Sequence, residues 1–162
     1  MATVIDGTTG VSLVQDGVVV QADLAANVAG NGPAFRAYAT GTTSITSSEN
    51  KVTLAGKEWD TANAFDAVTN SRFQPAIAGY YQLNARVQFA SATYSVNAGF
   101  RKNGVNTSNS QTSTVNSQTL SDVVYLNGST DYVELWAFSA TTQNANSGAN
   151  LTYFSGSLVR AA

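Results

Sequence analysis

The sequence of 162 residues contains no cysteine and no histidine, and only 11% of its residues are charged. Without cysteine and histidine the chain cannot form a disulfide, a Ser-His-Asp triad, a cysteine nucleophile or a zinc site of the usual kind. The net charge is −2, and the basic residues form no run, so we expect neither nucleic acid nor an anionic membrane as a partner. These absences exclude most familiar catalysis and most charge-driven binding.

Long apolar segments are also missing. The longest uninterrupted apolar run is a few residues around Val18–Val20. The first ten residues lack the basic and apolar regions of a signal peptide. We therefore expect a protein that is made and assembled in a cytoplasm.

Hydroxyl and amide side chains take the place of the missing charges. Ser, Thr and Asn together account for 51 residues, whereas helix surfaces are usually built from Glu, Lys and Arg. A surface of this kind favours strands and loops. The composition therefore predicts an all-β protein, and the length predicts one domain with a short appendage.

The first 33 residues differ from the remainder. Glycines interrupt short runs of Val, Ala and Asp there, so this segment cannot form a core of its own. We predict an N-terminal arm over residues 1–33, either flexible or ordered by sister subunits. Residues 21–29 have helix-compatible spacing before Gly30 and allow a short helix or one turn of a stalk. The turn residues 31–33 mark the boundary with a head domain over residues 34–162.

The head shows a repeat of two residues. In residues 79–90, Tyr81, Leu83 and the alternate residues after them share one face, and polar side chains follow the other. Residues 94–101 alternate in the same way before Asn103-Gly104, which predicts a hairpin. Further strands are predicted over residues 119–126, 131–139 and 151–160. Strands and turns at these short intervals indicate a sandwich or jelly roll.

Several short motifs occur in a fixed order between residues 34 and 160. They are Ala34-Phe35, Phe65, Phe73 with Pro75, Gly79-Tyr80-Tyr81, Lys102-Asn103-Gly104, a looser set of Leu126, Gly128, Asp131 and Val133, and Tyr153-Phe154-Ser155-Gly156. In this order the sequence resembles the globular head of complement component one q, a branch of the tumour necrosis factor superfamily. It departs from the family at Pro75, which comes one residue early, and in the looser set, which carries a two-residue insertion.

The resemblance implies a ten-stranded antiparallel jelly-roll sandwich of the tumour necrosis factor-like type, assembled as a homotrimer on aromatic and aliphatic side chains. The composition supports a second burial surface, because 16 aromatic residues exceed what one sandwich interior of this size is expected to hide. The candidate trimer-interface residues are Tyr80, Tyr125, Tyr132 and Trp136. The alternative for each is a position under a loop or in solvent.

The arm resembles in style the Gly-, Thr- and Val-rich beginnings of bacteriophage tail-fibre and other virion proteins. This resemblance implies a virion protein that is made in the bacterial cytoplasm and contacts other virion proteins through residues 1–33. Complement relatives carry a collagen stalk before the head, but this chain has no Gly-x-y repeat. Their serum biology is therefore not transferred to it.

Two function classes remain. The first is a short fibre or spike whose trimeric head binds the bacterial surface, in particular glycan, through aromatic stacking and amide or hydroxyl groups. The second is a capsid or tail decoration protein with a structural role. For the first, the polar stretch 141–149 supplies the candidate ligand loop with Gln143, Asn144 and Asn146. The similar stretch 106–118 is either a loop or a polar edge strand.

Catalysis and metal binding have little support in the sequence. Glu58, Asp60 and Asp66 form the nearest carboxylate cluster, and a pair at a suitable separation would be required to cleave a glycosidic bond. We expect these carboxylates to be solvated instead, so the prediction is a protein that is not an enzyme. Calcium is an option because some family heads bind it, but the sequence has no Asp-x-Asp-x-Asp-Gly loop. No metal ligand, catalytic residue or cofactor is assigned.

Overall fold

The computed structural model describes residue 28 and residues 30–113 and 115–162, and every regular element in this part is a strand. The predictions for residues 1–27 and 29, including the short helix at 21–29, lie outside the described residues. The strands are β1 (Ala34–Tyr38), β2 (Thr43–Ile45), β3 (Asn50–Lys51), β4 (Gly56–Asp60), β5 (Phe65–Asp66), β6 (Arg72–Phe73), β7 (Ala78–Gln88), β8 (Val96–Lys102), β9 (Val105–Thr112), β10 (Ser117–Asn127), β11 (Val133–Ser139), β12 (Gln143–Ala145) and β13 (Tyr153–Ala161).

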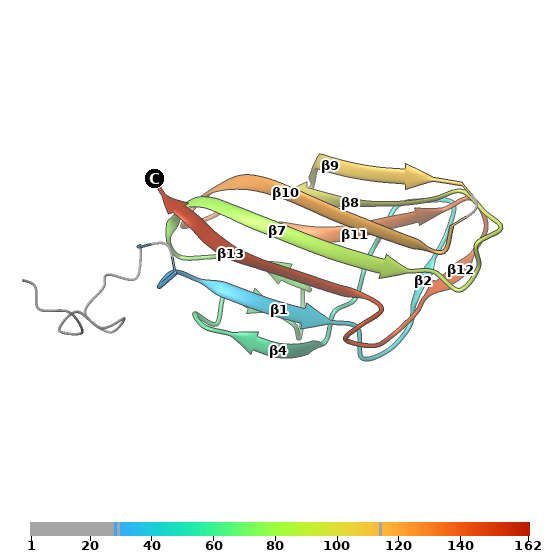
Figure 1. Cartoon of the computed structure of the whole chain (residues 1–162), viewed down its shortest axis with the longest axis horizontal. Helices are drawn as coiled ribbons and strands as arrows, with labels where there is room; N and C mark the ends of the chain where they lie inside the picture. The colour runs from blue at the N-terminus through green and yellow to red at the C-terminus, as the bar shows by residue number, and fades with distance from the viewer. Residues whose placement is uncertain (1–27, 29, 114) are drawn as a thin grey trace, which may run out of the picture.

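Two antiparallel sheets form a sandwich (Figure 1). The first sheet has the order β10-β7-β13-β1-β4 and the second has the order β5-β6-β11-β8-β9, with β3 added beside β11. A separate pair joins β12 to β2. The two main sheets have five and six strands, whereas the resemblance implied ten strands in all, and β2 and β12 form a further short pair. The prediction of an all-β antiparallel sandwich is confirmed.

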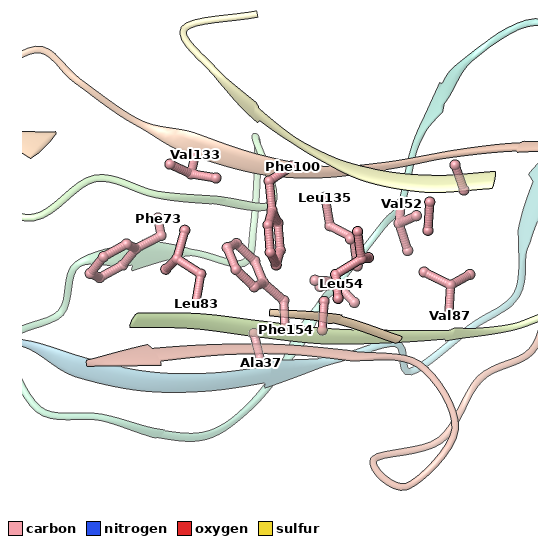
Figure 2. Packing of buried hydrophobic residues seen from close by; sticks show 14 of the residues in the cluster. Ala37, Val52, Leu54, Phe73, Leu83, Val87, Phe100, Val133, Leu135 and Phe154 are labelled. Atoms are coloured by element: carbon pink, nitrogen blue, oxygen red, sulfur yellow. The ribbon is translucent and has the colours of Figure 1, made fainter. Parts of the chain in front are cut away.

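Alternation along the strands builds the core between the sheets. In β7 every second residue from Gly79 to Val87 is buried, as the sequence pattern predicted. On the facing strand β11, Val133, Leu135 and Ala137 are buried. Figure 2 shows Leu83 and Val87 from one sheet opposite Phe100 and Leu135 from the other. Burial of these apolar side chains stabilises the fold because it removes their surface from water.

Five aromatic residues of the motifs meet in this core. Phe35 packs between Phe73 and Phe65, with ring centroids 4.3 Å and 5.0 Å away, and meets the edge of Phe154 at 4.9 Å. Tyr81 closes the cluster against Phe73 at 5.3 Å. Rings in these stacked and edge-to-face arrangements are favoured beyond their buried area. The aromatic residues of the motifs, although far apart in the sequence, are therefore in contact in the core.

Two Asn-Gly turns stand where the sequence predicted them. Asn103 and Gly104 have φ of 52° and 80° between β8 and β9, and Gly128 has φ of 71° after β10. Positive φ is tolerated by Gly because it has no Cβ, and by Asn because its short polar side chain forms local hydrogen bonds. Both turns thus reverse the chain without strain.

The two long polar stretches, 106–118 and 141–149, both contain strand residues. Residues 106–112 belong to β9, which confirms the edge-strand alternative. The expectation of a loop over 141–149 is wrong for Gln143–Ala145, which pair with β2 as strand β12. The reason is tertiary, since Ala145 is buried and bridges to Phe89, and a polar segment forms a strand once one residue is buried and its backbone is paired.

The two ends of the sandwich differ. Figure 1 shows the residues that lead into β1 at the same end as the C-terminus, whereas β2 and β12 lie at the other end. The backbone N–H of Leu158 donates to the carbonyl of Pro33 at 3.0 Å, and that of Ala162 donates to Ala78 at 3.1 Å. We call these the arm end and the far end.

Candidate binding surfaces

The outer face of the first sheet carries an exposed aromatic pair. Tyr80 in β7 and Tyr125 in β10 are direct cross-strand neighbours, with ring centroids 5.4 Å apart. They are 45% and 41% exposed, and Val123, two residues before Tyr125 on the same face, is 51% exposed. We call Tyr80, Val123 and Tyr125 the tyrosine patch. Large apolar side chains grouped on one face and left open to solvent are typical of an interaction surface.

A buried carboxylate supports this patch from the strand end. The Asp131 carboxylate forms an ion pair with Lys102 Nζ at 2.8 Å and accepts hydrogen bonds from Asn103 Nδ2 at 2.7 Å and from the Asn127 backbone at 3.0 Å. Hydrogen bonds from Lys102 and Asn103 hold the pKa of Asp131 below its usual range despite burial. Lys102 also donates to the carbonyl of Tyr125 at 2.7 Å. One network thus connects both Asn-Gly turns to the strand that carries Tyr125.

The other two interface candidates lie on the opposite outer face. Tyr132 precedes β11, and Trp136 alternates with core residues of β11, so both point away from the interior. The Arg72 guanidinium lies 4.6 Å from the Tyr132 ring centroid, and the Arg101 guanidinium lies 4.3 Å from that of Trp136. The four residues therefore do not form one surface. Sequence alternation predicts that a side chain points outward, but not which outer face it lies on.

Trp136 is also fixed by polar contacts within its own chain. Its indole N–H donates to Glu134 Oε2 at 2.9 Å, and Lys51 Nζ donates to Glu134 Oε1 at 3.1 Å. Arg101 in turn forms an ion pair with Glu49. These contacts satisfy the indole and cover one ring face within a single subunit.

The three candidate ligand residues lie close together at the far end. They differ in whether the side chain or the backbone forms the hydrogen bonds. Gln143 donates from Nε2 to Ser139 Oγ at 2.7 Å and accepts at Oε1 from the Ser91 backbone at 2.9 Å. Asn144 is exposed, and its carbonyl accepts from Ala90. Asn146 is half-buried and its backbone donates to Gln88 at 2.7 Å. Gln143 thus stabilises the far end, and Asn144 is the residue that presents a side chain to solvent.

The three carboxylates of the candidate cluster stabilise local structure. Glu58 forms an ion pair with Arg36 at 2.7 Å. Asp60 pairs with Lys57 at 3.0 Å and accepts from the backbones of Ala64 and Phe65.

Asp66 caps its own loop by accepting from the backbones of Val68, Thr69 and Asn70, and the bond from Thr69 is the main reason that its pKa is lowered. A lowered pKa is the reverse of what a general acid requires. Within the described part of the chain, no three Asp or Glu residues are grouped so that they would hold a metal ion. The described residues also include no helix of the length and apolarity that crossing a membrane requires.

Comparisons with known proteins identify the fold. No family model matches the sequence, and no curated protein matches it. Solved structures do match: murine APRIL at pH 8.5 superposes with a TM-score of 0.63 at 16% identity, over 78% of this chain and 98% of that one.

The Eiger TNF of S. frugiperda has a TM-score of 0.63 at 9% identity, covering 80% of this chain and 93% of its own. The globular domain of zebrafish complement 1qA has a TM-score of 0.56 at 17% identity, covering 80% and 99%. The head is therefore similar in fold to the tumour necrosis factor-like and complement-type jelly rolls, as its motifs implied. These neighbours are cytokine-type and complement-type domains rather than enzymes.

Proposed function

We propose that this protein is a non-enzymatic, homotrimeric head that residues 1–33 attach to a bacteriophage virion as a short fibre or spike, and that the head contacts the bacterial surface. The arrangement of the ends supports this role, because the chain enters the head beside the C-terminus and leaves the far end unattached. The attachment to a virion is supported by the resemblance of the arm to virion proteins. The homotrimer is supported by the family motifs of the head.

The tyrosine patch is the observation that carries the proposal. Three large side chains that are each more than 40% exposed stand together on a flat sheet face. Beside them, the Lys102 to Asp131 network fixes the end of β10. A preordered apolar surface loses little entropy when it binds. A second and third copy of the chain would bury this patch around a threefold axis.

The mass of the full chain in solution tests the assembly. We expect light scattering coupled to size exclusion to report three chains at micromolar concentration for the natural protein. The double substitution Tyr80→Ser and Tyr125→Ser should give single chains with an unchanged circular dichroism spectrum. Tyr94→Ser, which removes a similarly exposed tyrosine (38%) outside this patch, is the matched control and should leave three chains. A natural protein that is a folded monomer would contradict the proposal.

A decoration protein with a purely structural role is the second candidate. One observation favours it: the amide of Gln143 is used in hydrogen bonds to Ser139 and Ser91 and so is not offered to a ligand. Immunogold labelling of particles separates the two roles. Label at the tip of a tail or baseplate appendage supports the spike, whereas label spread over the capsid lattice, with adsorption unaffected by head antibodies, supports decoration.

A further inference from the structure

A hollow of about 420 Å³ lies on the flank of the sandwich, between β4 and the hairpin formed by β5 and β6. Its lining combines the cations Lys57 and Arg72, the amides of Asn63 and Gln74, and the apolar residues Ala64, Ala67 and Val68. The volume falls in the range of roughly 300 to 1,000 Å³ that is usual for small-molecule sites. A mixture of cations, amides and an apolar wall suits a ligand that is polar, anionic and partly apolar.

Arg72 is the unusual group of this hollow. Five ion pairs join cations and carboxylates in the described part of the chain, and Arg72 takes part in none of them. Its guanidinium contacts the Tyr132 ring at 4.6 Å but donates no hydrogen bond to a described residue. The side chain is nevertheless half-buried. A guanidinium held in place by an aromatic ring, with its N–H groups free, is prepared to bind a carboxylate through two parallel hydrogen bonds.

The neighbouring polar groups complete the site. Lys57 Nζ donates to Asp60 Oδ2 at 3.0 Å and to Asn63 Oδ1 at 3.2 Å, which fixes the Asn63 side chain and leaves its Nδ2 available. Gln74 donates from Nε2 to the carbonyl of Ser129 at 3.0 Å, which leaves its Oε1 available. The hollow thus offers both donors and acceptors, as hydroxyl groups require.

Asp66 is the one carboxylate in the lining, and its oxygens accept hydrogen bonds from its own loop. One oxygen accepts from the backbones of Val68 and Thr69 at 3.0 Å, and the other accepts from the backbone and side chain of Asn70 at 3.2 Å and 2.7 Å. Asp66 is the strand partner of Arg72, yet the two form no ion pair. The loop therefore supplies hydrogen-bond donors to the Asp66 carboxylate, which stays charged, and Arg72 forms no ion pair within the described part of the chain.

We propose that this hollow binds a carboxylated monosaccharide unit, with the carboxylate on Arg72 and the hydroxyl groups on Asn63 and Gln74. The inference rests on the proposed contact with a bacterial surface and names the class of glycan that is contacted. It also moves the candidate ligand site from the far end to the flank, where Arg72 forms no ion pair with any described residue.

Titration of the full chain with glucuronic acid tests this site. We expect isothermal calorimetry and ligand-observed NMR to detect glucuronate, and to detect glucose at least about ten-fold more weakly, since a charge-assisted bidentate contact contributes about 1.5 to 3 kcal/mol. Arg72→Met keeps an unbranched side chain of similar length beside Tyr132 but removes the guanidinium, and should lower glucuronate affinity to the level of glucose. Arg160→Met removes an exposed cation elsewhere and should change nothing.

Three outcomes would overturn the proposal: equal binding of glucose and glucuronate, competition by sodium sulfate at the same concentration as glucuronate, or unchanged glucuronate affinity in Arg72→Met. Sulfate competition would identify a general anion site instead. The mass of each sample is measured in parallel. Three chains that bind no sugar contradict only this site, whereas single chains that bind glucuronate contradict only the trimer.

Discussion

The two outer faces of the sandwich both carry aromatic side chains, but only one leaves them open. Tyr80 and Tyr125 on the β7 and β10 face are more than 40% exposed, although their ring centroids lie 5.4 Å apart and Lys102 Nζ lies 5.4 Å from the Tyr125 centroid. Tyr132 and Trp136 on the β11 face lie beneath Arg72 and Arg101. An outward aromatic is therefore evidence for a partner when much of its surface stays exposed despite the contacts within its own chain. The guanidinium groups over Tyr132 and Trp136 reduce their exposure, and such cation–π contacts stabilise by roughly 0.5 to 2 kcal/mol.

The largest expected effect comes from removing the covered pair. Tyr132→Ser together with Trp136→Ser should lower the free energy of unfolding by about 2 to 4 kcal/mol, because two cation–π contacts and a hydrogen bond to the buried Glu134 are lost. Denaturant unfolding measures this change. The mass in solution should stay at three chains. Loss of assembly without loss of stability would show that the β11 face, and not the β7 and β10 face, is the trimer interface.

The next effect concerns the network behind the open pair. Asp131→Asn should lower the free energy of unfolding by about 1 to 3 kcal/mol, because Lys102 then lies partly buried without its carboxylate. It should also weaken assembly, since Lys102 contacts the strand of Tyr125. Asp122→Asn, on the same strand but outside the network, is the control. Equal effects of the two substitutions would mean that the network does not support the patch.

Acid should affect the open face through the same carboxylate. Hydrogen bonds from Lys102 and Asn103 hold the folded-state pKa of Asp131 below the ordinary value of 3.8. The stability that this carboxylate contributes is therefore present above pH 3.8 and is lost as the pH falls through the lower folded value. Asp66 behaves alike. We expect the free energy of unfolding to fall below pH 4, and to fall less steeply in Asp131→Asn. Parallel pH curves for the two proteins would contradict the assignment.

The smallest effect belongs to the far end. Asn144→Ala removes an exposed side chain and should change the free energy of unfolding by no more than about 0.5 kcal/mol. Gln143→Ala should cost about 1 kcal/mol or more, because Ser139 Oγ and the Ser91 backbone lose their partner. Thermal melts of the two variants measure the difference. Equal melts would show that the amide of Gln143 contributes nothing to the far end.

The strands and their inward residues were predictable from the sequence. Residues 79–90 showed the alternation that buries Tyr81 and Leu83, and both Asn-Gly turns lie where they were expected. The motif order predicted the jelly roll because each motif residue is fixed by the core that it builds. The strand β12 was missed, since two of its three residues are polar and the segment forms a strand only when Ala145 is buried against Phe89.

The candidate site was predictable only in part. Tyr80 and Tyr125 were expected to be partners in an interface, and they lie side by side on one face. Tyr132 and Trp136 were expected beside them and lie on the other face. Arg72 gave no signal in the sequence, because it is distinguished by being half-buried without an ion pair or hydrogen bond to another described residue. That property depends on Asp66 turning into its own loop, which no spacing of residues shows.

The sequence by itself determined the alternation, the turns and the absence of cysteine and histidine chemistry, because these depend on residue type and on neighbours along the chain. The tertiary structure decided which outward side chains are covered. Arg101 reaches Trp136 from the neighbouring strand β8, and Lys102 reaches Tyr125, 23 residues further along the chain. A cation stabilises an aromatic ring or a carboxylate only where folding brings the two within a few ångströms, so their pairing is a property of the assembled sheets.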